Sequence, residues 1–204
     1  MLKNRKASFR QTLTRIRKAL GTRSIAMALL AGLFVTRNLP ADAKSPDVAR
    51  SPAAVMSEYC ALDAKGARLS SQNPLLNTMF SLVTWPEEPG WDSVHVIKKF
   101  AILGSHSKPT SATVTVGYAV LGQLSDLAFS RSSTRHQVVT FVLIKSGNEW
   151  RIQRPMIEPH ISVEAAMASL RSLLIDEKDA QRREQIRETL SVLGSLKSVN
   201  KHYK

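Results

Sequence analysis

The feature that most constrains the fold of this chain is a change in the spacing of its apolar residues near position 92. Over residues 52–83 they recur every three or four positions, and after position 92 they alternate with polar residues up to residue 153. Helical spacing predicts amphipathic helices, and alternation predicts strands with one buried face. We therefore expect an α+β protein in which helices precede a sheet.

Four segments are predicted to be strands, and turn residues separate them. Gly147 and Asn148 form a tight turn between the last two. Strands that follow one another through short turns pair as an antiparallel meander. The four expected strands cover residues 94–102, 114–120, 137–144 and 149–153.

Two helices are predicted before the sheet and two after it. The first has Ser51 as its N-cap and Gly66 as its stop, and Ser162 caps the third. The expected helices cover 52–65, a short stretch from 74, 163–174 and 176–197.

The last of these helices differs from the others in composition. Nine of the thirteen residues in 176–188 are charged, and its apolar residues form the narrow line Ile186, Leu190 and Leu193. A helix packed into a small domain normally has a broader apolar stripe. We expect this helix to lie on the surface or to reach a partner, with a homodimer as one possibility.

Residues 1–43 have the layout of a secretory signal peptide. Residues 1–24 are basic, and the apolar run 25–35 is eleven residues long, well short of the roughly 20 needed to span a bilayer. Ala41 and Ala43 provide a signal peptidase site, so cleavage is expected between Ala43 and Lys44. The protein is then periplasmic or secreted, with 44–50 as a linker, and it meets the membrane only before cleavage. An uncleaved membrane anchor is the alternative.

The charge of the chain is concentrated in this segment. The net charge is +13, but residues 1–43 hold nine bases and one acid, so the remaining 20 bases and 15 acids give +5. Basic residues of the remainder are scattered and form no stripe interleaved with aromatic residues, as single-stranded nucleic acid binding requires. Nucleic acid is therefore not expected as a partner.

Cys60 is the single cysteine, so no internal disulfide can form and the core alone must hold the fold. Within a predicted helix, a buried inert thiol is favoured over a nucleophile or an intermolecular bridge.

Four sequence segments carry a family resemblance. The helix SPAAVMSEYCALDAKG and the closing hairpin GNEWRIQRP resemble the nuclear transport factor 2-like superfamily, and WPEEPGWDSVHVI with ATVTVGYAVLG resembles its bacterial secreted members. The resemblance covers residues 51–160 and implies a cone-like curved antiparallel sheet of about four strands, packed on the N-terminal helices. The mouth of such a cone holds a ligand, an active site or only packed side chains. Residues 161–204 form a C-terminal helical extension outside the usual pattern.

Tyr59, Asp63 and Tyr118 are candidate pocket residues. Tyr59 and Asp63 lie four apart on one helix face. Asp63 lies in the last turn, where the helix dipole disfavours a carboxylate, so we expect Arg68 or a loop contact to hold it. General acid or base work by Asp63 remains an alternative, including a dyad with His95 or His136. Tyr118 shares a strand face with three valines, which suits either the core or a pocket.

The stretch TWPEEPGWD, residues 84–92, adds Trp85 and Trp91 to the candidates. Its prolines and glycine suit a corner between the second helix and the first strand. The two tryptophans then anchor the corner, and Glu87 and Glu88 are expected to be exposed. The alternative is an acidic, aromatic lip that grips a sugar or a cationic group.

The sequence contains no motif that identifies a reaction. The five histidines show no metal-ligand spacing, and nucleotide-binding and hydrolase motifs are missing, so no catalytic residue, cofactor or metal is expected. The leading interpretation is a secreted, non-enzymatic binding or accessory domain for an unknown small molecule or protein. One alternative is a cofactor-independent isomerase or dehydratase that uses the cone pocket. Another is a protein-interaction module acting through the terminal helix.

Overall fold

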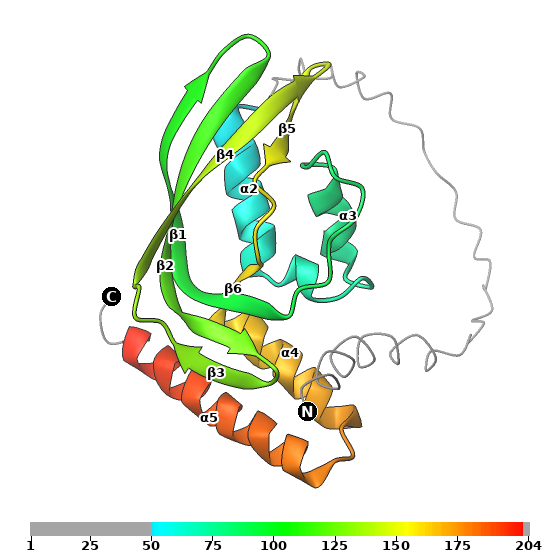
Figure 1. Ribbon diagram of the computed structural model, residues 1–204, viewed down its shortest axis with the longest axis vertical. Helices are drawn as coiled ribbons and strands as arrows, with labels where there is room; N and C mark the ends of the chain where they lie inside the picture. The colour runs from blue at the N-terminus through cyan, green and yellow to red at the C-terminus, as the bar shows by residue number, and fades with distance from the viewer. Residues whose placement is uncertain (1–49, 202–204) are drawn as a thin grey trace, which may run out of the picture. The chain divides into compact units, whose positions relative to one another are not determined.

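The structure is a computed structural model that describes residues 50–201, with side chains described up to residue 197 (Figure 1). The expected signal peptide and most of the expected linker lie outside the described residues. Four α-helices and six strands lie within them. The α+β class is therefore confirmed, whereas the expected number of four strands is wrong.

The first helices begin and end where their capping residues stand. Helix α2 (Pro52–Ala64) begins after Ser51, whose hydroxyl accepts a hydrogen bond from the Ala54 amide at 3.2 Å. Gly66 follows it with a φ of +80°, a left-handed conformation that glycine adopts at little cost. The short turn η2 (Ala67–Leu69) and helix α3 (Pro74–Phe80) complete this part of the chain.

The six strands form one sheet in the order β5-β4-β2-β1-β6, with β3 paired to β2. All pairs are antiparallel except that between β1 and β6. The four expected strands are present as β1, β2, β4 and β5, and their neighbours in the sheet follow the expected meander. The bounds are β1 (Ser93–Ser107), β2 (Ser111–Ser125), β3 (Ala128–Arg131), β4 (His136–Ser146), β5 (Glu149–Arg154) and β6 (His160–Ser162).

The two unexpected strands are too short to show a period of two. Strand β3 has four residues and follows a turn in which Asp126 and Leu127 both have positive φ, a conformation for which glycine is the usual signal. Strand β6 has three residues and pairs in parallel with His95 to Ile97 of β1. Sequence reasoning placed neither in the sheet.

The first hydrophobic cluster lies between α2 and the inner face of the curled sheet (Figure 1). Buried residues of α2 meet alternate residues of β2 and β4, which face inward. The chain between α3 and β1 closes the edge beside β5, where Ile152 exchanges backbone hydrogen bonds with Leu82 and Thr84. The largest buried side chains here include Tyr59, Tyr118, Phe141, Met56 and Met79.

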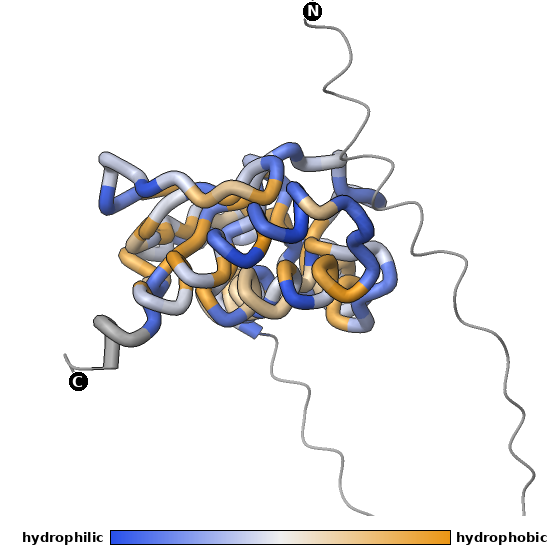
Figure 2. The backbone as a smooth tube through the Cα atoms, turned by 90° about the horizontal axis from the view of Figure 1, so that it is seen from below, coloured by the Kyte–Doolittle hydropathy of each residue, from blue (hydrophilic) through white to orange (hydrophobic). Residues whose placement is uncertain are grey.

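A second hydrophobic cluster lies under α4 (Val163–Asp176) and α5 (Ala180–Lys201). Figure 2 shows hydrophobic and hydrophilic positions alternating along the helical turns, as helices with one apolar side require. Ile186 is 1% exposed and Leu193 is 0% exposed. The terminal helix was expected to lie on the surface or to reach a partner, and the structure shows that its narrow apolar line packs into the second cluster. Its apolar line is narrow because α4 and β3 cover only one narrow side of it.

Candidate functional site

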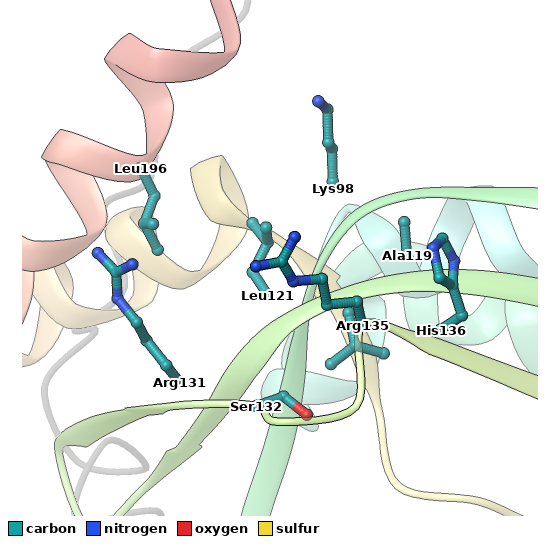
Figure 3. Close-up of a pocket in the computed structure, with 9 residues that line it drawn as sticks. Lys98, Ala119, Leu121, Arg131, Ser132, Arg135, His136 and Leu196 are labelled. Atoms are coloured by element: carbon teal, nitrogen blue, oxygen red, sulfur yellow. The ribbon is translucent and has the colours of Figure 1, made fainter.

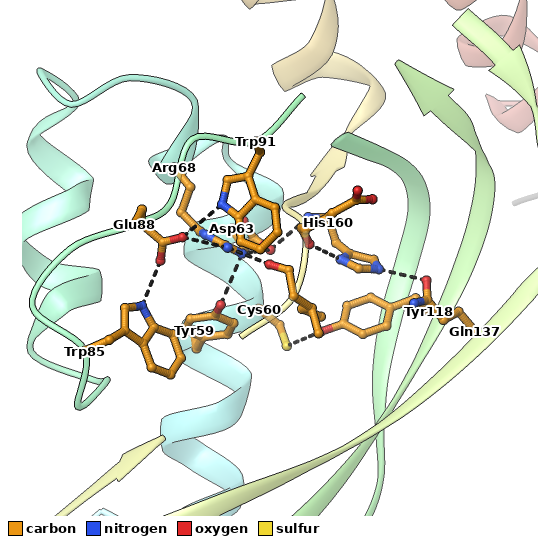
Figure 4. Close-up of polar contacts among 12 residues, drawn as sticks. Tyr59, Cys60, Asp63, Arg68, Trp85, Glu88, Trp91, Tyr118, Gln137 and His160 are labelled. Carbon is orange, nitrogen blue, oxygen red and sulfur yellow. Dashed lines mark hydrogen bonds and ion pairs between the residues drawn. The ribbon is translucent and has the colours of Figure 1, made fainter. Parts of the chain in front are cut away.

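Arg68 is the centre of a buried network of polar side chains (Figure 4). Its Nη1 donates to Tyr59 Oη at 3.2 Å and to Asp63 Oδ2 at 3.5 Å. Its Nη2 donates to Glu88 Oε2 at 2.7 Å and to the Ile157 carbonyl at 2.6 Å. One guanidinium therefore joins α2, the corner 84–92 and the segment before β6. We call these residues, with Trp85, Trp91, His160 and Gln137, the Arg68 network.

The corner 84–92 is held to the domain from inside. Trp85 Nε1 donates to Glu88 Oε1 at 2.9 Å, and Trp91 Nε1 donates to Glu88 Oε2 at 3.1 Å. The Trp91 ring also lies 5.3 Å from the Arg68 guanidinium carbon, within cation–π range. Glu87 is exposed, as expected. The expectation of an exposed Glu88 is wrong, because two indole N–H groups and Arg68 draw its carboxylate inward.

Asp63 is 1% exposed at the end of α2. The expected pairing with Arg68 is confirmed, and the His160 amide also donates to Asp63 Oδ2 at 2.9 Å. Neither His95 nor His136 bonds to it among the described residues, so the considered dyad is not formed. Burial raises the pKa of Asp63 to about 6, although the Arg68 charge and the His160 amide act in the opposite direction. Its Oδ1 has no partner within the described residues.

His160 is buried, and its ring lies between Tyr118, at a centroid distance of 4.2 Å, and His95, at 4.8 Å. Its Nδ1 is 2.8 Å from the Glu158 carbonyl, and its Nε2 is 2.9 Å from Gln137 Oε1. A neutral imidazole ring has one N–H, which can sit on Nδ1 and donate to the Glu158 carbonyl. If the Gln137 amide group is flipped so that its nitrogen faces the ring, that nitrogen can donate to Nε2. Burial lowers the pKa of His160 to about 4, and the neighbouring His95 adds to this effect.

Tyr118 contacts Cys60 rather than Arg68. Its hydroxyl lies 3.3 Å from Cys60 Sγ. Burial raises the pKa of the Cys60 thiol to about 12, and it also raises the pKa of Tyr118 and of Tyr59. All three groups therefore keep their protons at neutral pH. The thiol is unreactive in this environment, because only a thiolate is a good nucleophile.

A half-buried polar cluster borders the network on the side of β1. Ser93 Oγ donates to Glu158 Oε1 at 2.9 Å, and Gln123 Nε2 donates to Ser93 Oγ at 2.7 Å. His95 Nε2 lies 3.1 Å from Glu158 Oε2. Solvent reaches these side chains, since those of His95 and Glu158 are 24% and 36% exposed.

The candidate residues chosen from the sequence are thus divided by the structure. Tyr59, Asp63, Trp85 and Trp91 meet around Arg68, and Tyr118 lies beside Cys60 and His160. His160, Gln137 and the inward position of Glu88 were missed. The one signal for them was the unfavourable place of Asp63 at a helix end, which required a donor from elsewhere in the chain.

The charged and protonated groups of this site are largely shielded from solvent. Tyr59, Asp63, Tyr118 and His160 are between 0% and 2% exposed. Within residues 50–201, no group of three potential ligands is placed to hold a metal ion. Over the same residues, no helix is long and apolar enough to cross a membrane.

Neither the scan against protein-family models nor the searches of curated proteins and of solved structures gave a match for this chain. The resemblance to the nuclear transport factor 2-like superfamily therefore stays a prediction.

Proposed function

We propose that this protein is an exported, non-enzymatic binding domain of the nuclear transport factor 2-like type. The observation that carries the proposal is the burial of Tyr59, Asp63, Arg68 and His160 in the Arg68 network. A general acid or base must lie within hydrogen-bond reach of its substrate. Asp63 instead accepts hydrogen bonds from Arg68 and from the His160 backbone amide, and the His160 ring contacts the Glu158 carbonyl and Gln137. We infer that both residues stabilise the fold.

The architecture agrees with this interpretation. The sheet curls around α2, which is the arrangement that the resemblance implies for a cone. Large side chains such as Tyr59, Tyr118 and Phe141 are fully buried between helix and sheet. A filled interior suits a scaffold whose ligand binds elsewhere on its surface.

Export is supported by the sequence alone. The basic stretch 1–24, the apolar run 25–35 and Ala41 with Ala43 are typical of a cleaved secretory signal. The mass of the product exported by a bacterial host should correspond to a chain that begins at Lys44. A membrane-bound chain that retains its basic N-terminus contradicts this part of the proposal.

A cofactor-independent enzyme is the second candidate, because Asp63 Oδ1 is buried without a partner among the described residues and its carboxyl has a raised pKa of about 6. Perturbed carboxyls of this kind also occur in active sites. The half-buried cluster of Ser93, His95 and Glu158 provides the nearest approach from solvent. An interaction module acting through α5 is less well supported, since Ile186 and Leu193 face the protein's own core.

One experiment separates the binding domain from the enzyme. The purified protein is incubated with a metabolite extract, and both retained and remaining compounds are identified by mass spectrometry. A binding domain retains a compound and releases it unchanged on denaturation. The proposal is contradicted if the wild type converts one compound into another and the folded Asp63→Asn variant does not. That result supports the enzyme.

A further inference from the structure

A cavity of about 390 Å³ opens on the outer face of the sheet. Ala119 lines it and stands between Tyr118 and Val120, which are buried in the first cluster. Val120 stands next to a bulge and borders the cavity as well. Because side chains alternate along a strand, Ala119 faces away from α2. His136 is paired with Ala119 and also lines the cavity, whereas its neighbour Gln137 reaches the Arg68 network. Cavity and network therefore lie on opposite faces of β2.

Two bulges between β1 and β2 shape the wall of this cavity. Val96 pairs with Gly122 and Ile97 with Val120, so Leu121 is left without a partner in the ladder. The next shift leaves Lys98 without one. A bulge bends its strand and redirects the extra side chain. Leu121 and Lys98 both line the cavity.

The segment between β3 and β4 forms a second wall and is tied to β2 by its backbone. The Ser132 amide donates to the Leu121 carbonyl at 3.2 Å, and the Val120 amide donates to the Arg135 carbonyl at 2.9 Å. Arg131 ends β3 at the start of this segment. The backbone that carries the two arginines is therefore held in place, while their side chains are exposed.

Three permanent positive charges border the cavity, and none of them is paired with an acidic side chain in the described part of the chain. Lys98, Arg131 and Arg135 extend to the same side of the sheet, where Leu196 of α5 also lies (Figure 3). None of the three makes an ion pair or side-chain hydrogen bond with the residues whose side chains the structure describes, and none of the described lining residues is acidic. Like charges held together raise the free energy of the empty site, and a bound anion lowers it.

We propose that this basic cavity binds a phosphate group carried on an apolar body. A guanidinium matches two phosphate oxygens with parallel hydrogen bonds, and Lys98 adds a point charge. Three cations suit the double charge of a phosphate monoester better than the single charge of a carboxylate. Leu121 and Leu196 provide an apolar wall beside the charges. The inference rests on the proposed function as a binding domain and names its ligand class.

The size and lining of the cavity favour a small ligand over a nucleic acid strand. Its volume lies in the range of small-molecule sites, roughly 300–1,000 Å³. Single strands are held by aromatic rings on which the bases stack. His136 is the one ring among the described lining residues.

The test measures binding of defined probes to the purified protein by calorimetry. The probes are dodecyl phosphate below its micelle concentration, laurate as a carboxylate of similar chain length, and a single-stranded oligonucleotide. Vesicles of phosphatidylcholine, with and without phosphatidic acid, distinguish a lipid headgroup from a soluble organophosphate. The variant is Lys98→Gln/Arg135→Gln. Its matched control, Lys99→Gln/Arg171→Gln, makes the same charge change at exposed positions outside the cavity.

The wild-type protein should bind dodecyl phosphate, phosphatidic acid vesicles, or both. The Lys98→Gln/Arg135→Gln variant should bind them about tenfold or more weakly, because it has lost charged hydrogen bonds. The control should bind within about twofold of the wild type, since solvent and salt screen exposed charges. The inference is overturned if the two variants lose equal affinity, or if the wild type binds laurate as tightly as dodecyl phosphate. It is also overturned if the wild type binds the oligonucleotide more tightly than the phosphate probes, or binds neither phosphate probe. The proposed function fails separately, if the metabolite extract leaves nothing bound to the protein.

Discussion

The guanidinium of Arg68 donates a 2.7 Å hydrogen bond to the carboxylate of Glu88, twenty residues further along the chain. The Arg68 side chain is 0% exposed and that of Glu88 is 12% exposed, so this ion pair lies inside the protein. Buried charges are tolerated only when each is paired and hydrogen-bonded. The pair therefore links the corner 84–92 to the end of α2.

Replacing Arg68 by Met is expected to lower the free energy of unfolding by about 3–5 kcal/mol, because Asp63 and Glu88 then lose their buried counter-charge. The matched control is Arg50→Met, which removes the exposed pair with Glu58 and should cost about 0–1 kcal/mol. Urea unfolding followed by tryptophan fluorescence measures both. Similar small losses in the two variants contradict a central role for Arg68.

Asp63 and His160 act on stability in opposite directions as the pH changes. The folded-state pKa of Asp63 is raised from 3.8 to about 6, so its contribution is full at low pH and is lost as the pH rises through about 6. The pKa of His160 is lowered from 6.5 to about 4, so its contribution is present above 6.5 and is lost as the pH falls towards 4. Each shift of about two units corresponds to roughly 3 kcal/mol.

Single variants should separate the two effects. On acidification from about pH 7 to about pH 4.5, Asp63→Asn should lose stability more steeply than the wild type, because it lacks the opposing stabilisation from protonation of Asp63. His160→Gln should lose less stability than the wild type, or gain some. Thermal unfolding across this range gives the three profiles. Parallel profiles for all three proteins show that neither pKa is shifted by folding.

Cys60 should react with a thiol reagent at least about tenfold more slowly in the folded protein than in urea, because it is 1% exposed and burial raises its pKa to about 12. Absorbance of the released reagent follows the reaction. Rapid labelling of the folded protein means that α2 does not face the sheet as described.

The inward side of α5 can be tested with two neighbouring residues. Leu193→Ala removes a fully buried side chain of the second cluster and should cost about 2–5 kcal/mol. Val192→Ala changes a side chain that is 40% exposed and should cost less than about 1 kcal/mol. Chemical unfolding compares the two. Equal effects contradict the packing of α5, and a change of oligomeric state in Val192→Ala assigns the outer side of the helix to self-association.

The four long strands and the caps of the first helix could be predicted because their signals are local. Alternation reports the face of a strand, and Ser51 and Gly66 report the ends of a helix. Strands β3 and β6 could not be predicted, since their few residues are ordered by contacts with β2 and β1. The burial of Ile186 and Leu193 was missed for a related reason, because a narrow apolar line is sufficient when only α4 and β3 cover it.

In the candidate site, too, contacts between residues close in sequence could be predicted and contacts between distant residues could not. Asp63 was flagged by its place at a helix end, and its pairing with Arg68 followed from proximity in sequence. The His160 amide lies 97 residues away in sequence, and no local pattern connects it with Asp63. Glu88 was assigned to the surface because acidic residues in a proline-rich corner are normally solvated. The two indole N–H groups that draw it inward become visible only once the corner is folded.

We propose that the Arg68 network stabilises the fold and that the basic cavity on the other face of β2 binds the ligand. The most direct test measures both properties in three proteins: the wild type, Glu88→Gln, and Lys98→Gln/Arg135→Gln. Glu88→Gln places an amide donor opposite other donors and should lower the free energy of unfolding by about 1–3 kcal/mol, while its affinity for dodecyl phosphate stays within about twofold of the wild type. The cavity variant should keep its stability and lose affinity. If Glu88→Gln instead loses affinity for dodecyl phosphate and keeps its stability, these separate roles are contradicted. Binding then takes place in the Arg68 network.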